Sequence, residues 1–281
     1  MNKKNDIGFM QGRLSPQING KIQCFPVEFW RDELELASKN NCCLVEWTLD
    51  YEDLYLNPLI SKSGQNEIKK LQKLLNIKIE SVTGDCFMQQ PFWKKEYEKG
   101  FNLKKLFLDV VEACEKMNIK YLVVPLVDNG SIENYSQEHN LLSFLLDNEA
   151  YFRKINLKII FESDFKPKQL KKMILKLDDS TFGINYDTGN SAYLGYDSDE
   201  EFYEFGDRIL NIHIKDRNLK GDTVPLGEGK VNFFKIFKNL KKVNYSGNFI
   251  LQTARAKDNE HLHAIIKYKK FVDRMVSSYL N

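Results

Sequence analysis

The chain has 281 residues, which suits one large domain, because α/β barrels commonly run to about 250 residues as a single unit. Its composition, 42% hydrophobic and 28% charged, is that of an ordinary globular protein and excludes collagen-like, coiled-coil and disordered chains. With 41 basic and 39 acidic residues, the chain lacks the strong basic excess typical of nucleic-acid binders. We therefore expect no nucleic-acid partner.

Cysteine usage and hydropathy indicate the cellular compartment. The five cysteines are odd in number, include the adjacent Cys42 and Cys43, and form no CxxC motif. This pattern argues against a disulfide framework or a zinc ribbon and predicts reduced thiols. No segment approaches the ~20 apolar residues of a membrane span, and the first residues lack a signal-peptide core. We expect a cytoplasmic protein with no membrane partner.

Short apolar runs rich in β-formers alternate along the chain with longer segments of helical period. Strands that are buried on both faces read as such runs, which is typical of parallel sheets. Eight strands are predicted, in chain order, over Ile7–Arg13, Leu44–Leu49, Ile79–Asp85, Tyr121–Val127, Lys158–Asp164, Phe182–Asp187, Ile209–Lys215 and Asn248–Thr253.

Amphipathic helices are predicted between these strands, most clearly over 64–76, 99–118 and 258–280. Pro167 is expected in a first helical turn, and Asn232 is expected to cap the helix that starts at Phe233. Eight alternating units without a break predict one α/β domain over residues 1–281, a (β/α)₈ TIM barrel. The alternative is a doubly wound sheet, but no GxGxxG or GxxxxGK[ST] follows any strand.

Two local features qualify the predicted elements. Proline cannot donate to a strand ladder, so Pro125 predicts that the fourth strand ends near Val124. Residues 128–140 are polar and are predicted to form a long loop after that strand.

Catalytic groups of such barrels lie where the strands end, so the polar residues at those positions are the candidates. Glu162, Asp187 and His213 close the fifth, sixth and seventh predicted strands. Two carboxylates and an imidazole suit Mn²⁺, Mg²⁺ or Co²⁺, and zinc is an acceptable alternative. The residue types leave open that each carboxylate pairs with a Lys or Arg and that His213 is an ordinary buried histidine.

Four short motifs occur in order at these strand ends. They are Phe161-Glu162-Ser163-Asp164, Tyr186-Asp187-Thr188-Gly189-Asn190, His213-Ile214-Lys215-Asp216-Arg217 and Leu226-Gly227-Glu228-Gly229-Lys230-Val231-Asn232-Phe233. Together they resemble the sugar phosphate isomerase/epimerase family of xylose-isomerase-like barrels, over nearly the whole chain. The resemblance implies a single divalent metal held by Glu162, Asp187 and His213, with Gln252 where the family usually has a glutamate.

The resemblance also implies a reaction. A family of this kind suggests a metal-dependent sugar or sugar-phosphate isomerase or epimerase that works through an enediolate, with Glu162 as base and Lys215 as a second catalytic residue. Gln252 cannot act as a base, which favours one-base isomerisation over two-base epimerisation. Glu46 or Asp216 is the candidate replacement base. The alternatives are a dehydratase of a keto-sugar or cyclitol, and a barrel with decayed catalysis that binds a sugar.

Further polar residues at the strand ends are candidate substrate ligands: Arg13, Glu46, Asn190, Arg217 and Arg255. With Lys215, the three arginines would favour an anionic carbohydrate such as a phosphate. The open alternative is that these cations pair with acidic neighbours. Proteins of the family that the chain resembles commonly form dimers and tetramers, so we expect a homo-oligomer. A further alternative is a DNA-repair nuclease of the same fold. The resemblance to that class would imply a trinuclear zinc site with histidines at several strand ends, whereas only His213 ends a predicted strand here.

Overall fold

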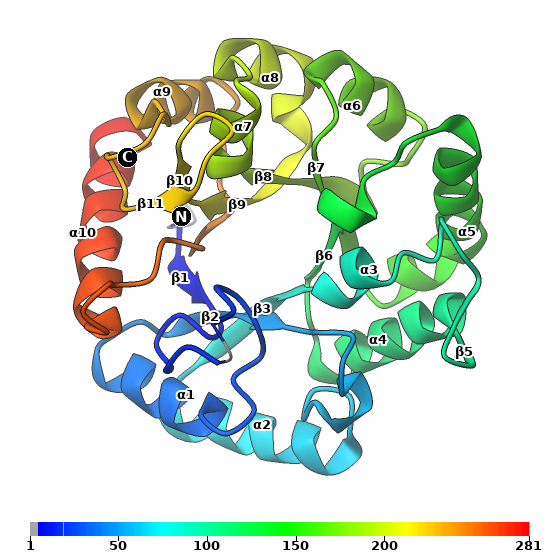
Figure 1. The fold of residues 1–281 in the computed structure, drawn as a ribbon, viewed down its shortest axis with the longest axis horizontal. Helices are drawn as coiled ribbons and strands as arrows, with labels where there is room; N and C mark the ends of the chain where they lie inside the picture. Colours follow the sequence, from blue (N-terminus) through cyan, green and yellow to red (C-terminus); the bar gives the residue numbers. More distant parts are fainter. Residues whose placement is uncertain (1–4, 19, 281) are drawn as a thin grey trace.

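The computed structural model describes residues 5–18 and 20–280 and shows a closed barrel of eight parallel strands. Around the barrel each strand pairs with the next barrel strand of the chain, and β1 pairs with β12 to close the ring (Figure 1). The strands are β1 (Ile7–Met10), β2 (Leu44–Thr48), β3 (Lys78–Thr83), β6 (Tyr121–Leu126), β7 (Lys158–Ser163), β8 (Phe182–Asp187), β9 (Ile209–Ile214) and β12 (Asn248–Leu251). The predicted TIM barrel and its eight strands are confirmed.

Helices surround the strands and alternate with them along the chain (Figure 1). The outer helices are α1 (Trp30–Lys39), α2 (Lys62–Leu75), α4 (Leu103–Met117), α5 (Tyr135–Lys154), α6 (Pro167–Ile174), α8 (Ser198–Phe205), α9 (Phe233–Lys242) and α10 (His261–Tyr279). Pro167 is the first residue of α6, and the Asn232 side chain accepts a hydrogen bond from the Lys235 N–H to cap α9, so both predictions are confirmed. No helix in the described part of the chain is long and apolar enough to cross a membrane.

Shorter elements lie in the connections. They are the helices α3 (Asp85–Gln89) and α7 (Thr188–Leu194), the antiparallel hairpins β4 (Tyr97–Glu98) with β5 (Phe101–Asn102) and β10 (Asp216–Arg217) with β11 (Thr223–Val224), and the 3₁₀ turns η1 (Leu54–Leu56), η2 (Asp128–Gly130) and η3 (Gly206–Arg208).

Two predictions near the fourth strand are wrong. Strand β6 continues through Pro125 to Leu126, and Pro125 pairs with Glu162 of β7. The pairing of β6 with β3 ends at Val123. The backbone N–H and C=O positions of Pro125 face the same edge of β6 as those of Val123, so the N–H that proline lacks would have had no strand to bond there. The polar stretch 128–140 is a loop only at its start, because α5 begins at Tyr135 with the Asn134 side chain as its cap.

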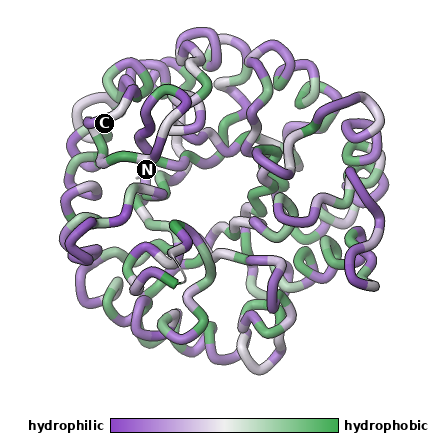
Figure 2. Tube along the Cα trace, viewed as in Figure 1, coloured by the Kyte–Doolittle hydropathy of each residue, from purple (hydrophilic) through white to green (hydrophobic). Residues whose placement is uncertain are grey.

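The apolar core lies between the barrel and its helices. Large aromatic residues fill this layer, including the fully buried Phe107 and Phe152, whose ring centroids lie 6.2 Å apart. Figure 2 shows hydrophilic and hydrophobic stretches alternating around the helical ring, as expected for helices that bury one face. The helices thus hold the barrel from outside and leave its interior free to carry other chemistry.

The barrel interior is polar in its upper part. Paired residues on neighbouring parallel strands point to the same side of the sheet, and side chains alternate between the two sides along each strand. The strand register therefore shows which side chains point into the barrel. It includes the small apolar cluster of Met10, Leu44 and Ile250. Above it, buried polar side chains replace the branched apolar residues that usually fill such barrels: Glu46, Ser81, Thr83, Glu162, Asn185, Asp187, Asn211, His213 and Gln252.

Candidate metal centre and active site

Three potential metal ligands meet inside the barrel mouth. Glu162 lies in β7, Asp187 ends β8 and His213 lies in β9, and one ligand atom of each lies within 4.8 Å of the others. All three side chains are buried. Two carboxylates that meet inside a protein repel each other, and a divalent cation between them would offset that repulsion.

Glu46 fixes the orientation of the His213 ring. Its Oε1 atom lies 2.6 Å from His213 Nε2, and both side chains are fully buried. The other ring nitrogen, Nδ1, lies 3.0 Å from Glu162 Oε2, but this contact lacks hydrogen-bond geometry. A carboxylate that holds one imidazole nitrogen while the other faces further ligands is the arrangement that orients metal-binding histidines.

The Glu46 carboxylate is completely enclosed by donors. Besides His213, it accepts hydrogen bonds from Ser81 Oγ at 2.6 Å, from Thr83 Oγ1 and from Asn211 Nδ2 at 3.0 Å. Burial alone would raise its pKa, but His213 and the hydroxyl donors hold the pKa of Glu46 below its ordinary value. In turn, burial disfavours the charged ring of His213, yet Glu46 and Glu162 outweigh it and raise the pKa of His213 to about 10.

Asp187 is paired with Lys215. The Lys215 Nζ atom lies 2.8 Å from Asp187 Oδ2, while Asp187 Oδ1 accepts the Asn190 backbone N–H at 2.8 Å and so caps α7. Burial would raise the pKa of Asp187, but Lys215 and His213 hold it below the ordinary value. Gly189 explains how Lys215 reaches this place, because a Cβ atom there would lie 2.6 Å from Lys215 Cγ.

Glu162 is held by two asparagine amides. Its Oε1 accepts from Asn190 Nδ2 at 2.6 Å, and its Oε2 accepts from Asn185 Nδ2 at 3.0 Å. Asn211 Nδ2 donates to Asn185 Oδ1 at 2.9 Å and also to Glu46, so the amides connect the two carboxylates across the barrel. This network fixes the position of Glu162 without neutralising its charge.

The buried polar atoms without a hydrogen-bond partner among the described residues include His213 Nδ1, Gln252 Oε1 and Asn211 Oδ1. Gln252 directly follows β12, next to β9, and the alternation of β12 turns its side chain into the barrel two residues beyond Ile250. An unpaired imidazole nitrogen and an unpaired amide oxygen beside two carboxylates fit a divalent cation, since buried polar atoms are otherwise paired. The side chains present therefore fit a metal ion.

Two of the basic residues that were predicted to bind an anion make hydrogen bonds to the loop after β1. Arg255 donates to the carbonyl oxygens of Gly12 and, at 2.8 Å, of Ser15. Arg13 is almost completely buried and donates to the Ile22 carbonyl oxygen and to Gln23 Oε1. These contacts assign both guanidinium groups to the loop.

Arg217 lies closer to the candidate ligands. Its Nη1 donates to Asn190 Oδ1 at 3.1 Å, its Nε and Nη2 donate to the Gly221 carbonyl oxygen, and the group stacks on the Tyr193 ring at 4.0 Å. Asn190 therefore joins Arg217 to Glu162, and Lys215 contacts the same amide at 3.5 Å. The alternative that these cations pair with acidic neighbours holds for Lys215, which pairs with Asp187, whereas Arg217 forms no ion pair among the described residues.

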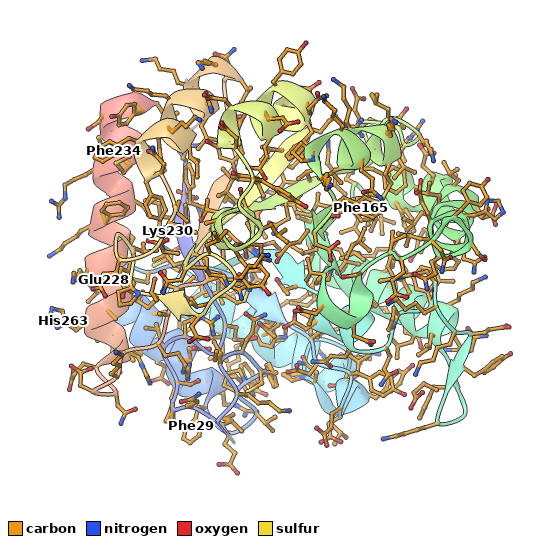
Figure 3. The ribbon with its side chains drawn as sticks, turned by 45° about the horizontal axis from the view of Figure 1, so that its top comes forward. Phe29, Phe165, Glu228, Lys230, Phe234 and His263 are labelled. Atoms are coloured by element: carbon orange, nitrogen blue, oxygen red, sulfur yellow. The ribbon has the colours of Figure 1, made fainter. Side chains whose placement is uncertain are left out.

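Asp216 organises a glycine-rich loop. Its carboxylate accepts the backbone N–H groups of Gly227 at 2.8 Å, Gly229 at 3.0 Å and Val231 at 3.1 Å, and it has no exposed surface. Glu228 and Lys230 mark this loop beside α10 in Figure 3. The loop motif read from the sequence is thus a structural feature built around one buried aspartate.

A separate cavity is not lined by any of the three candidate ligands. It measures about 750 Å³ and opens between the loop after β12, the β10–β11 hairpin and α10. Both signs of charge line it, with Arg255 and Lys267 facing Asp222 and Glu228. Its size does not make it the chemical centre, which is defined by the convergent side chains of β7, β8 and β9.

Comparison with known proteins places the chain in a family. Residues 34–268 match the family model described as xylose isomerase-like TIM barrel. The chain belongs to the xylose isomerase-like TIM-barrel family. The chain is 34% identical over 261 residues to an Escherichia coli (strain K12) protein named "Putative L-ribulose-5-phosphate 3-epimerase SgbU", covering 87% of this chain and 90% of the relative. It is 21% identical over 274 residues to an inosose dehydratase of Clostridium perfringens (strain ATCC 13124), with coverage of 83% and 90%.

Solved structures of this family share the barrel. One is a Mycobacterium smegmatis xylose isomerase-like TIM barrel in complex with magnesium, with a TM-score of 0.72, 14% identity and 98% of each chain covered. Another is the IOLI protein with a bound zinc atom, with a TM-score of 0.71, 17% identity and coverage of 98% of this chain and 99% of that chain. At such low identity these structures show that the chain shares their fold.

Several residues that surround the site of this xylose isomerase-like barrel were not predicted from the sequence. Ser81, Thr83, Asn185 and Asn211 lie inside strands, where small polar residues look like ordinary strand positions. Their only signal is that polar residues alternate with apolar ones in buried strands, which is unusual for a barrel interior. Gln23, in the loop after β1, carried no signal at all.

Proposed function

We propose that the protein is a divalent-metal-dependent enzyme that transfers a proton between neighbouring carbons of a sugar or sugar phosphate through an enediolate. The observation that carries the proposal is the convergence of Glu162, Asp187 and His213, together with the unpaired atoms His213 Nδ1 and Gln252 Oε1. These four residues would hold the ion. When bound, the ion would polarise the substrate carbonyl and stabilise developing negative charge, which is worth several kcal/mol. Mn²⁺, Mg²⁺ or Co²⁺ are favoured, and Zn²⁺ is acceptable.

Glu162 is the proposed base. The neutral amides of Asn185 and Asn190 hold both of its oxygens in place, so proton transfer needs no rearrangement of the carboxylate. Lys215 and Arg217 both contact Asn190 at the same rim, and we assign Lys215 to the chemistry and Arg217 and Asn190 to substrate binding. We propose that Arg13 and Arg255 act on the substrate only through the loop that they hold.

Substitution of the usual fourth-ligand glutamate by Gln252 favours a one-base reaction. Two-base epimerisation needs an acceptor on each face of the sugar, whereas aldose–ketose isomerisation needs one group that moves the proton between adjacent carbons. Glu46 and Asp216 have no exposed surface, unlike Glu162, so we assign neither to proton transfer or substrate contact. Both act as positioning residues in this account.

Dehydration is the second candidate. It needs the same metal and one base, and relatives of this chain include proteins named inosose dehydratase. The relative at 34% identity carries an epimerase name and a phosphorylated substrate in that name, so the substrate test must include both phosphorylated and free ketoses. A homo-oligomer remains part of the proposal.

The deciding experiment is exchange in D₂O. The metal-loaded protein would be incubated with free pentuloses and hexuloses, pentulose 5-phosphates and a keto-inositol, and followed by NMR and mass spectrometry. We expect wild-type protein to introduce deuterium at the carbon beside the carbonyl with one substrate class, and Glu162→Gln to lose the exchange. Loss of one water identifies a dehydratase. Tight binding of a sugar without exchange or mass change would contradict catalysis and support a barrel that only binds its ligand.

A further inference from the structure

The side chain of Gln252 contacts Gln23, which in turn contacts Arg13 and Asp85. Gln252 Nε2 donates to Gln23 Oε1 at 2.8 Å. The same Gln23 oxygen accepts from Arg13 Nη2 at 3.2 Å, and Gln23 Nε2 donates to Asp85 Oδ2 at 2.5 Å. Gln23 comes from the loop after β1 and Asp85 begins α3 after β3, so three barrel connections meet at this point.

These partners fix which end of each amide points where. Arginine has only donors, so the Gln23 atom that faces Arg13 must be the carbonyl oxygen. The Gln252 atom that faces the same oxygen must then be its NH₂ group, because two carbonyl oxygens would repel each other. The Gln252 oxygen is left pointing away from Gln23, buried and without a partner among the described residues.

A carboxylate would not fit this arrangement. A glutamate at position 252 would place an oxygen against Gln23 Oε1, and Gln23 could turn its amide only by giving up its contacts with both Arg13 and Asp85. The surroundings of Gln252 are therefore matched to an amide.

We propose that Gln23, held by Arg13 and Asp85, is a positioning residue that turns the Gln252 carbonyl oxygen toward the metal centre, so that this chain binds its ion with a neutral fourth ligand. The inference rests on the proposed function, since it needs a metal between Glu162, Asp187 and His213. In a site that had lost its metal, by contrast, no neighbouring side chain would need to fix the orientation of the Gln252 amide.

Mn²⁺ titration followed by electron paramagnetic resonance tests the proposal, because only free Mn²⁺ gives the strong solution signal. Removing an outer partner of a metal ligand typically lowers metal affinity by about 10- to 100-fold. We expect Gln23→Leu and Gln252→Leu each to weaken Mn²⁺ binding by about this factor, and the double variant to be no weaker than Gln252→Leu.

The double variant separates positioning from a merely structural role. If the two leucine substitutions multiply their effects, Gln23 acts independently of Gln252 and the proposal is overturned. Gln252→Leu with wild-type affinity also overturns it, while the proposed function stands as long as Asp187→Ala abolishes binding. Wild-type protein that binds no Mn²⁺ would instead remove the proposed function itself. Melting curves of the metal-free variants, compared with wild type, show that each is folded.

A sign reversal provides a second test that misfolding cannot imitate. In the Gln252→Glu background, Gln23→Leu removes the opposing oxygen and frees the new carboxylate to ligate. We expect the Gln23→Leu substitution to weaken Mn²⁺ binding in the wild-type background and to strengthen it in the Gln252→Glu background. Weakening by the same factor in both backgrounds would contradict the proposed orientation of the Gln252 amide.

Discussion

Substitution of Glu46 by glutamine tests how the barrel prepares its histidine. The change keeps the shape of the side chain but replaces one oxygen with an NH₂ group. Oε1 of Glu46 faces His213 Nε2, and Oε2 faces Asn211 Nδ2, so each oxygen meets a nitrogen donor. Neither position suits an NH₂ group.

The two orientations of the new amide have different costs. An NH₂ group facing His213 requires Nε2 to accept, which moves the ring proton to Nδ1, the atom that faces Glu162. An NH₂ group facing Asn211 opposes a second donor, and Asn211 can turn its own amide only by losing its hydrogen bond to Asn185. The first orientation blocks the metal and the second strains the network.

The expected loss of metal affinity follows from the role of Glu46, which contacts the candidate ligand His213 but not the metal itself. Glu46→Gln should weaken divalent-metal binding about 10- to 100-fold, which corresponds to about 1.4–2.8 kcal/mol. Loss of the buried charge beside His213 should also lower the free energy of unfolding of the metal-free protein by about 3 kcal/mol.

Isothermal titration with Mn²⁺ and urea unfolding measure these two quantities. Ser81→Ala is the matched control, since it removes one donor to Glu46 and leaves the carboxylate and His213 intact. The control should bind metal within about threefold of wild type, as expected when one neutral hydrogen bond is lost. Glu46→Gln with wild-type metal affinity would refute the reasoning.

Three further predictions concern the loops around the site. Gly229→Ala places a Cβ atom 2.1 Å from Asp216 Oδ1, so the free energy of unfolding measured in urea should fall by about 1–3 kcal/mol; an unchanged midpoint would contradict the close packing of this loop. Arg255→Met removes two hydrogen bonds to loop carbonyl oxygens and should cost about 1–3 kcal/mol, while the melting shift caused by inorganic phosphate stays as in wild type; loss of that shift would make Arg255 an anion ligand. Burial raises the pKa of Glu33 to about 7 from its ordinary 4.5, so the folded state binds the Glu33 proton more tightly than the unfolded state does. The protonated side chain therefore stabilises the fold by about 3 kcal/mol at most, and this contribution is lost as pH rises from about 4.5 to about 7. The stability difference between wild type and Glu33→Gln, measured in urea at pH 5 and pH 8, should change by up to this amount; a constant difference would show that Glu33 ionises normally.

The barrel and the three ligands could be predicted because their signals are local. Each strand is a short apolar run, and a charged residue at its end stands out against that run. Parallel strands that close a barrel bring those ends together, so Glu162, Asp187 and His213 could be grouped without knowledge of their contacts. The extent of β6 through Pro125 was missed because a proline's effect depends on whether a strand lies opposite its nitrogen.

The functions of the surrounding residues depend on contacts that no local pattern records. Glu46 lies 167 positions before His213, and Gln23 lies 229 positions before Gln252, so their pairings appear only in the folded barrel. The arginines show the same limit. Arg13 and Arg255 follow strands, as anion ligands would, and only the folded barrel shows that their guanidinium groups contact backbone carbonyl oxygens.

The central claim is that Glu162, Asp187 and His213 hold a divalent metal ion. The most direct measurement is elemental analysis of protein purified without added metal, beside thermal-shift titrations with Mn²⁺, Mg²⁺, Co²⁺ and Zn²⁺ on wild type and on the three alanine variants of these residues. The account predicts a single ion per wild-type chain, and a metal-dependent rise in melting temperature that all three substitutions abolish. A wild-type protein with no metal and no shift, or a shift that survives all three substitutions, would contradict it.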